Sequence, residues 1–295
     1  MSSTISNCER FESVVGSLGK PAFRQRNVAI YHLDCIDGMR RMQAGVVNLC
    51  VTSPPYNIGK EYETSLPLKE YLDWSEEWIS NVHRVVTSNG SFWLNLGYLS
   101  IPNRARAIPL PYLLWNRVPF FLVQEIIWNY GAGVATRYSF SPRNEKFLWY
   151  VKNSDNYVFN LDAVRDPEVK YPNQKKNGKL KCNPLGKNPS DVWTIPKVTS
   201  GANRASEERT DHPAQFPAAV IERILRACSN EGDIVLDPFM GSGTTAEVAL
   251  DLDRFVIGFE VKAAYIGTAI ERISDHLRRR ERVLAQQSLF QEAGG

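Results

Sequence analysis

The stretch Val51-Thr-Ser-Pro-Pro-Tyr-Asn57 constrains this chain most, because two consecutive prolines stop a short apolar run at a fixed place. Residues 48–52 are expected to form a buried strand, and a residue before a proline is driven toward extended backbone. The prolines also remove backbone donors, so carbonyls near Ser53 and Pro54 cannot be tied up in a local helix. An exocyclic amine of a planar substrate could donate to these acceptors while its ring stacks on Tyr56. Such an arrangement suits methylation of a nitrogen.

A second predicted strand end lies much later in the chain. Asp233-Ile-Val-Leu-Asp237 has the pattern of a buried strand, and a glycine turn follows it and leads into a helix over residues 244–250. Because Asp237 would repel a phosphate and no Lys follows the glycines, a phosphate-binding loop is disfavoured, and a cationic cofactor fits better. The next predicted strand, 254–260, ends in Glu260, which is suitably placed for a ribose diol. The expected ligand is S-adenosylmethionine.

With these segments the chain resembles the amino-group DNA methyltransferases, in particular the permuted β class, in which the catalytic motif precedes the cofactor motif. Ser53-Pro54-Pro55-Tyr56 matches the catalytic tetrapeptide of that family. Asp237–Thr245 matches its cofactor loop, and His212–Pro217 matches the segment just before the loop. Asp34, at the end of a predicted strand over 28–33, falls at the third cofactor position. The similarity covers roughly residues 27–275.

The order of predicted elements favours an α/β fold. Predicted strands alternate with helices, which indicates parallel crossover units and a terminal hairpin. The strands are expected at 28–33, 46–52, 91–96, 121–128 and 145–151, and helices at 36–43, 69–86, 109–118, 217–228 and 261–284. Together with the resemblance, this order implies a Rossmann-like methyltransferase fold. Its sheet would be mostly parallel and twisted, with a terminal antiparallel hairpin, helices on both faces and a circularly permuted motif order.

The chain divides into four predicted segments. Residues 1–26 are polar and weakly periodic, which indicates a flexible N-terminal arm or a short cap. Residues 27–152 would form the catalytic half of the methyltransferase domain, and 212–295 the cofactor-binding half with the C-terminal helix. Between them, 153–211 are rich in Asn, Lys, Pro, Gly and Ser, and the resemblance implies that this insertion is the target-recognition region.

The inserted segment is also strongly basic. Residues 170–204 hold eight Lys or Arg residues and one acid, a local charge of +7 in a chain whose net charge is +3. A basic module of this kind is typical of a surface that binds a phosphate backbone, although a solvated loop has the same composition. The family that the chain resembles keeps its target-recognition region between these two motifs, and this resemblance favours double-stranded DNA as the partner. The expected DNA-binding residues are Lys175, Lys176, Lys179 and Lys181.

The resemblance implies roles for the motif residues. The Ser53 side chain and the Pro54 carbonyl would accept hydrogen bonds from the target amine, and Tyr56 would stack on a base that has been flipped out of the duplex. Methyl transfer would then be direct, with no enzyme nucleophile and no metal. Asp237 would face the methionine amino group, Glu260 the ribose and Asp34 the adenine. The expected cofactor-binding residues are Asp34, His212, Asp237, Pro238, Phe239, Gly241, Gly243, Thr244 and Glu260.

The identity of the methylated base is less constrained. In the family, Ser at the first motif position usually accompanies cytosine-N4 methylation, whereas Asp or Asn there usually accompanies adenine-N6 methylation. Ser53 therefore favours cytosine, although Asn57 after Tyr56 is more typical of adenine enzymes. An RNA or protein-glutamine methyltransferase and a non-catalytic DNA-binding module are further alternatives. The resemblance also implies a restriction-modification role, with a cognate restriction endonuclease as a possible functional partner and a monomeric or homodimeric protein.

Composition excludes several other classes. No run approaches the ~18 apolar residues of a membrane helix, and the N-terminus lacks a basic region followed by an apolar stretch. A cytoplasmic protein of a bacterium or phage, with no membrane contact, is expected. Five cysteines with no C-x-x-C pair indicate neither a disulfide framework nor a zinc site. None follows a proline, which disfavours the Pro-Cys nucleophile of the related carbon-methylating enzymes.

Overall fold

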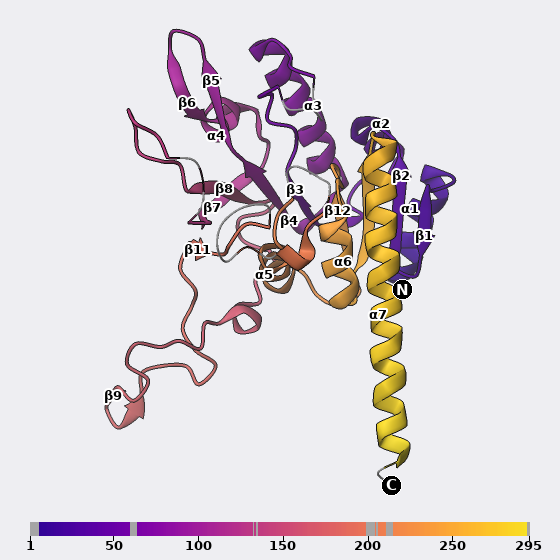
Figure 1. Ribbon diagram of the computed structural model, residues 1–295, viewed down its shortest axis with the longest axis vertical. Coiled ribbons are helices and arrows are strands. Elements are labelled where there is room, and N and C mark those ends of the chain that lie inside the picture. Colours follow the sequence, from indigo (N-terminus) through magenta and orange to yellow (C-terminus); the bar gives the residue numbers. More distant parts are fainter. Residues whose placement is uncertain are drawn as a thin grey trace.

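A nine-stranded mixed sheet organises the structure, a computed structural model that describes residues 6–59, 64–131, 133, 135–198, 204, 206–210 and 215–293. The strand order is β1-β2-β13-β12-β3-β4-β8-β7-β11 (Figure 1). The main-sheet strands are β1 Phe23–Gln25, β2 Val28–His32, β3 Val47–Thr52, β4 Val86–Leu96, β7 Phe121–Asn129, β8 Asn144–Val151, β11 Val192–Thr194, β12 Ile234–Asp237 and β13 Phe255–Glu260.

Five neighbouring strands, from β2 to β4, run parallel, and β8 is antiparallel to both β4 and β7. The predicted parallel sheet with an antiparallel hairpin is therefore confirmed. The two strands from the C-terminal part of the chain, β12 and β13, are inserted side by side between β2 and β3. The carboxyl ends of β3 and β12 meet at the same edge of the sheet, which we call the catalytic edge.

Helices cover both faces of the sheet, as predicted. One face packs against α1 Asn7–Leu18, α2 Cys35–Arg41, α3 Leu68–Val85 and α4 Leu110–Leu114. The other face packs against α5 Ala218–Cys228, α6 Thr244–Asp251 and α7 Ala263–Ala293.

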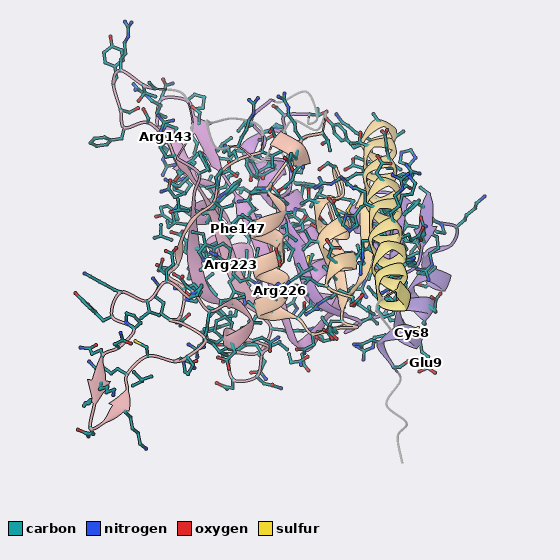
Figure 2. All side chains as sticks on the ribbon, turned by 60° about the horizontal axis from the view of Figure 1, so that its bottom comes forward. Cys8, Glu9, Arg143, Phe147, Arg223 and Arg226 are labelled. Carbon is teal, nitrogen blue, oxygen red and sulfur yellow. The ribbon has the colours of Figure 1, made fainter. Side chains whose placement is uncertain are left out.

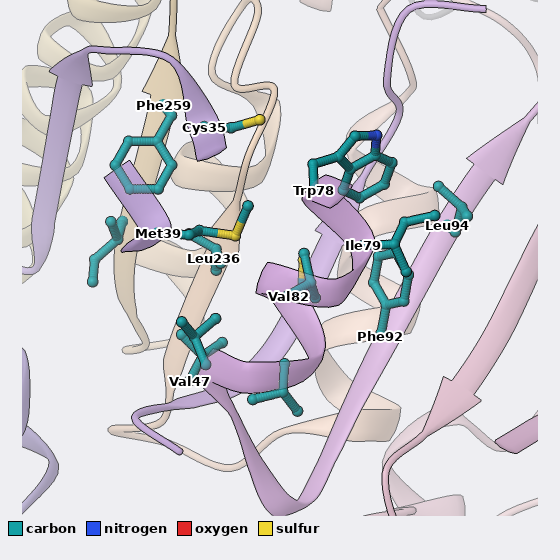
Figure 3. Close-up of a cluster of buried hydrophobic side chains, with 14 of the residues drawn as sticks. Cys35, Met39, Val47, Trp78, Ile79, Val82, Phe92, Leu94, Leu236 and Phe259 are labelled. Carbon is teal, nitrogen blue, oxygen red and sulfur yellow. The ribbon is translucent and has the colours of Figure 1, made fainter. Parts of the chain in front are cut away.

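Side chains alternate between the two layers along each central strand, as the pleat of a strand requires. In β12, Ile234 and Leu236 join the first layer, whereas Val235 joins the second. Figure 3 shows the first layer where Trp78 and Val82 of α3 lie over the sheet. Strands buried on both faces are near-continuous apolar runs, which is why they were predictable from the sequence.

Residues before β2 form a cap on the body. Helix α1 begins with a capping box, in which the Ser6 side chain accepts from the Glu9 backbone amide and Glu9 binds back to the amide of Ser6. Its residue Phe11 is fully buried. Of the two expectations for residues 1–26, the structure therefore shows the short cap over residues 6–25. The division of the chain into four segments stays a prediction.

The structure differs from the predicted secondary structure in three details. Strand β4 begins at Val86 rather than residue 91, and a hairpin of β5 Tyr98–Ile101 and β6 Ala105–Pro109 precedes α4. Strands this short and this exposed lack the sustained apolar pattern that marks a buried strand. The expected helix over 109–118 is shorter, since α4 ends at Leu114 and a 3-10 turn, η1 Trp115–Arg117, follows it.

The insertion is rich in loops, as its composition indicates. It contains the 3-10 turns η2 Leu161–Val164 and η3 Ser206–Glu208, and a two-stranded hairpin of β9 Lys175–Lys176 and β10 Lys179–Leu180. Its strand β11 pairs in parallel with β7 and extends the main sheet. The β9–β10 hairpin projects well away from the rest of the molecule (Figure 1).

Replacing Phe11 with Ala tests the attachment of the N-terminal cap. The Phe11 ring lies 4.7 Å from the ring of Phe255 on β13, and the Arg24 guanidinium lies 4.6 Å above it. Removing a buried ring costs about 3–5 kcal/mol, so the free energy of unfolding in urea should fall by about 3 kcal/mol. The matched control is Ser13→Ala on the exposed face of the same helix, which should change stability by less than about 0.5 kcal/mol. Equal effects of the two substitutions would contradict a packed helix.

Candidate active site

A cavity of about 190 Å³ opens at the catalytic edge, where β2, β3, β12 and β13 end. It brings together all four residues of the predicted catalytic tetrapeptide. It also collects most of the predicted cofactor residues, namely Asp34, Asp237, Pro238, Phe239, Gly241, Thr244 and Glu260. His212 lies outside the described residues. The structure thus gathers in one cavity two motifs that are about 180 residues apart in the sequence.

Asp237, at the end of β12, is buried and fully engaged. One carboxylate oxygen accepts from the Thr52 hydroxyl at 2.8 Å and from the Phe239 amide at 3.1 Å, and the other accepts from the Thr245 hydroxyl at 2.7 Å. Burial nevertheless raises the pKa of Asp237 to about 6, because desolvation outweighs the stabilisation that these donors give to the charged form. Thr52 directly precedes Ser53, so this carboxylate joins the cofactor loop to the catalytic motif.

Glu260, at the end of β13, holds the glycine turn. Its two oxygens accept backbone N–H bonds from Gly241 at 3.0 Å and from Lys262 at 2.8 Å. The turn can pack tightly on β13 because residue 258 is a glycine: a Cβ there would lie 1.9 Å from the Met240 methyl carbon. A carboxylate that accepts two backbone amides is oriented, and it keeps lone pairs for a ligand in the cavity.

Two other predicted cofactor residues have clear structural roles. Asp34 caps α2 by accepting from the Ile36 amide at 2.8 Å, so its carboxylate is fixed at the cavity rim. Gly243 precedes α6 with a φ of 80°, a conformation that favours glycine. A Cβ at Gly243 would lie 3.1 Å from the Ala269 side chain of α7, so Gly243 serves the packing of α6 on α7. It is not among the residues that line the cavity.

The catalytic tetrapeptide is held by Asn95, a residue that the sequence analysis did not single out. The Asn95 amide oxygen lies 3.2 Å from the Ser53 hydroxyl and 2.6 Å from the Tyr56 hydroxyl, and these two hydroxyls are 2.9 Å apart. The Asn95 amide nitrogen donates to the Lys146 carbonyl at 3.1 Å, which fixes the orientation of its oxygen. Asn95 is fully buried near the end of β4. A lone Asn in an apolar strand was the signal that could have identified it.

The hydrogen bonds of Asn95 decide whether the Ser53 hydroxyl faces the cavity as a hydrogen-bond donor or as an acceptor. The Asn95 oxygen is an acceptor only, so both hydroxyls can donate to it. Ser53 can give its single proton to the Asn95 oxygen or to the Tyr56 hydroxyl, and in either case its oxygen keeps a lone pair for a donor in the cavity. The geometry therefore prepares Ser53 as an acceptor rather than as a donor.

Backbone contacts hold the Tyr56 ring. Gly97 lies directly behind it, since a Cβ there would approach within 2.8 Å of a ring carbon. The preceding Pro55 carbonyl accepts from the Tyr71 hydroxyl at 2.9 Å. Asn57 has a φ of 61°, and its side-chain amide donates to the Leu66 carbonyl at 2.8 Å and accepts from the Leu66 amide at 2.6 Å. Asn57 thus closes a loop next to the motif.

Helix α7 supports the first turn of α6. The Arg272 guanidinium donates to the Thr244 hydroxyl at 2.9 Å and forms an ion pair with Glu247. His276 bonds both Glu247 and Asp251, and these carboxylates raise its pKa to about 9. Because Thr244 lines the cavity, α7 takes part in shaping it. Gln215 and Phe216 of the matched segment His212–Pro217 line the cavity, as do Trp74, Lys262 and Tyr265, which the sequence did not single out as site residues.

The four predicted DNA-binding lysines are not near this cavity. Lys175, Lys176, Lys179 and Lys181 are all exposed on or next to the β9–β10 hairpin. The insertion begins after Val151, the last residue of β8. Val151 pairs with Ser91 of β4, so it lies away from the ends of the parallel strands where Ser53 is found. Figures 1 and 2 both show the hairpin projecting from that side. DNA binding by these lysines stays a prediction.

Comparison with known proteins identifies the family. A family model described as DNA methylase matches residues 47–271. The chain belongs to this DNA methylase family. It is 57% identical over 264 residues to the type II methyltransferase M.ScaI of Streptomyces caespitosus, covering 90% of this chain and 87% of the relative. It is 34% identical over 253 residues to the DNA adenine methyltransferase YhdJ of Escherichia coli strain K12, covering 83% and 82%.

Solved structures show the same fold. The cytosine-N4-specific PvuII DNA methyltransferase aligns with a TM-score of 0.67 at 22% identity, over 88% of this chain and 94% of that protein. The complex of M1.HpyAVI with S-adenosylmethionine aligns with a TM-score of 0.53 at 25% identity, over 83% and 99%. The predicted relation to DNA amino-methyltransferases and the Rossmann-like fold are both confirmed. In the described part of the chain, no helix is long and apolar enough to cross a membrane.

The raised pKa of Asp237 makes a prediction about stability. Its pKa is about 6 in the folded protein, against 3.8 for an aspartate side chain in water. The folded state therefore binds a proton more readily than the unfolded state, and the contribution of this group to stability falls as the pH rises from about 4 to 6. Asp237→Asn does not titrate, so its stability relative to the wild type should rise by about 1 kcal/mol between pH 5 and pH 7.5. Urea unfolding of both proteins at both pH values measures this difference. A constant difference would mean that Asp237 has an ordinary pKa.

Proposed function

We propose that this chain transfers a methyl group from S-adenosylmethionine to the N4 amino group of a flipped cytosine in double-stranded DNA. The observation that carries the proposal is the Ser53 hydroxyl, held by Asn95 as an acceptor beside the Tyr56 ring. The family membership supports the reaction class, and the remaining choice concerns the base.

The cavity suits the cofactor. S-adenosylmethionine carries a positive sulfonium and an amino group. Among the described residues that line the cavity, three are acidic, Asp34, Asp237 and Glu260, and one is basic, Lys262. Aromatic side chains offer apolar surface for the adenine: Trp74, Phe216, Phe239 and Tyr265. When bound, the cofactor supplies an electrophilic methyl group. We assign Asp237 to the methionine end, Glu260 to the ribose and Asp34 to the adenine.

The residues of the chain then act on the target amine. Ser53 Oγ and the Pro54 carbonyl accept its two N–H bonds, which turns the nitrogen lone pair out of conjugation with the ring and toward the methyl group. Positive charge develops on this nitrogen as the bond to the methyl carbon forms and the bond from that carbon to sulfur breaks, and the nitrogen would then release one of its protons to solvent. Acceptors that are already oriented stabilise that charge without reorganisation. Tyr56 stacks on the flipped base, which offsets part of the few kcal/mol needed to flip it.

Two observations favour cytosine over adenine. The first motif position is Ser, and the resemblance associates Ser with cytosine-N4 methylation. Asn57, the feature more typical of adenine enzymes, uses its amide to bind the backbone of Leu66. The similarity to an adenine methyltransferase supports the alternative, adenine-N6 methylation. Both bases present an amino group that could donate to Ser53 and Pro54.

A restriction-modification role follows as part of the proposal. The most extensive similarity reported above is to a type II methyltransferase. Methylation at a defined site would protect host DNA from a cognate restriction endonuclease with the same recognition sequence.

Substitution at Ser53 and Asn95 separates catalysis from binding. Ser53→Ala should lower kcat by about 10²-fold, since it removes an interaction that strengthens in the transition state, while the affinities for cofactor and DNA stay unchanged. Asn95→Leu should also lower kcat, and adding it to Ser53→Ala should cost little more, because both act through one hydrogen-bond network. Ser154→Ala at an exposed position is the control. Turnover of Ser53→Ala close to that of the control would remove Ser53 from the mechanism.

The product identifies the base. Genomic DNA from cells that express the protein, digested to nucleosides and measured by mass spectrometry, should contain N4-methyldeoxycytidine. DNA from cells that express Ser53→Ala is the control and should contain little of it. N6-methyldeoxyadenosine as the sole product would overturn the choice of cytosine and leave the reaction class intact. Absence of both nucleosides would overturn the proposed function.

A further inference from the structure

Two segments beside the active site carry positive charge without acids. Residues 97–110 contain Arg104 and Arg106, residues 130–144 contain Arg137 and Arg143, and neither segment contains Asp or Glu. None of these four arginines has an ion-pair partner among the described residues. Elsewhere most arginines of the described chain are paired, as Arg117 is with two carboxylates of α3.

Both segments are joined to the catalytic motif. The first begins at Gly97, against which the Tyr56 ring packs. Its next residue, Tyr98, donates through its hydroxyl to the Asn144 side chain at 3.1 Å, where the second segment ends. Two residues later, the Lys146 carbonyl holds Asn95. The two segments therefore form one continuous rim at the catalytic edge.

The second segment presents the most exposed aromatic rings among the described residues. Tyr138 is 88% exposed and Phe140 is 102% exposed. A local turn holds them outward: the Thr136 amide donates to the Ser141 hydroxyl at 3.2 Å, and the Thr136 hydroxyl donates to the Ser139 carbonyl. In Figure 2 this segment projects from the body above Arg143, away from the β9–β10 hairpin. Rings as exposed as these have no role in the core.

We propose that this rim, made of Arg104, Arg106, Arg137, Tyr138, Phe140 and Arg143, is the surface that binds double-stranded DNA around the flipped nucleotide. The arginines bind phosphates on either side of the target. Tyr138 and Phe140 stack on bases that lose their neighbour when the target leaves the duplex. The inference rests on the DNA methyltransferase function proposed above and adds the surface that performs the opening.

Charge and ring chemistry together select this partner. Unpaired arginines attract phosphates and release counterions on binding, which makes the affinity depend on salt. Stacking on an exposed ring is worth about 1–3 kcal/mol per base, enough to offset much of the cost of flipping. An uncharged surface with exposed rings would fit a protein partner. A charged surface without rings would bind the phosphate backbone and make no contact with the bases.

The first experiment measures the phosphate contacts. Binding of a fluorescent 30-base-pair duplex of random sequence, followed by anisotropy at several salt concentrations, is compared for the wild type and two double variants, Arg104→Ala with Arg106→Ala and Arg137→Ala with Arg143→Ala. The slope of log affinity against log salt should become shallower by about 0.9 for each phosphate contact removed. The charge-matched control is Arg278→Ala with Arg279→Ala, on exposed positions of α7. Wild-type slopes for both rim variants would overturn the arginine assignment.

The second experiment measures stacking. The recognition site is first read from methylated DNA, and 2-aminopurine then replaces the target base in a duplex. Tyr138→Leu with Phe140→Leu should lower both the fluorescence of the flipped base at saturating protein and the turnover. Tyr138→Leu with Phe140→Trp keeps one stacking ring, so it should retain most of the wild-type fluorescence and turnover. Leu keeps an apolar side chain, so this comparison separates stacking from simple apolar contact. Full fluorescence and turnover in the Leu variant would overturn the aromatic assignment.

The outcomes distinguish the rim from the activity itself. If the wild type methylates no DNA, the proposed function fails. If the wild type methylates DNA and the rim variants match it in salt dependence and in flipping, only the rim fails. The rim substitutions could instead change the sedimentation coefficient of the free protein and leave its DNA affinity unchanged. That result would assign the surface to contact with a second copy of the chain and would overturn the proposal.

Discussion

The hydrogen bond between Thr52 and Asp237 is the interaction on which the active site depends. It spans from the last residue of β3 to the last residue of β12, and so fixes the catalytic tetrapeptide relative to the cofactor loop. A buried carboxylate is costly unless donors surround it, and here two threonine hydroxyls and a backbone amide do so. The three donors come from β3, from the loop after β12 and from α6. Asp237 therefore holds the catalytic motif and the cofactor loop in a fixed relative position.

This constraint explains why the order of motifs along the chain matters little. β12 pairs with β3 on one side and with β13 on the other, so the strands from the C-terminal part enter the middle of the sheet. What the chemistry requires is that the carboxyl ends of adjacent parallel strands meet at one edge, as in other open α/β sheets. The segment between β8 and α5 carries the insertion and returns to the cavity at Gln215 and Phe216.

The sequence was sufficient for features that a short pattern encodes. The buried parallel strands and the strand-end acids Asp237 and Glu260 could be predicted because apolar runs, prolines and glycines mark them locally. Asn95 could not be assigned a role, because its partners follow β3 or lie on β8, and only the folded sheet brings them together. The sequence left open a flexible arm or a short cap for residues 1–26 and did not predict helix α1, because three buried residues on one helix face, Phe11, Val14 and Leu18, are a weak signal in a polar segment. The place of the β9–β10 hairpin relative to the active site depends on the end of the sheet at which β8 finishes. The composition of the insertion carries no information about that end.

The positions of the two basic surfaces restrict how a duplex can lie. The rim is at one end of β8 and the insertion begins at the other, and β8 has eight residues, which extend about 26 Å at ~3.3 Å per residue. DNA that crossed only the catalytic edge would contact the arginines of the rim but would leave the β9–β10 hairpin without a phosphate. A duplex that contacts both must instead run along the strand direction, past the edge where β11 pairs with β7. In that orientation the insertion would meet base pairs at some distance from the target, while the rim would contact its immediate neighbours. Opening of the duplex and recognition of distant bases would then be carried out by separate parts of the chain.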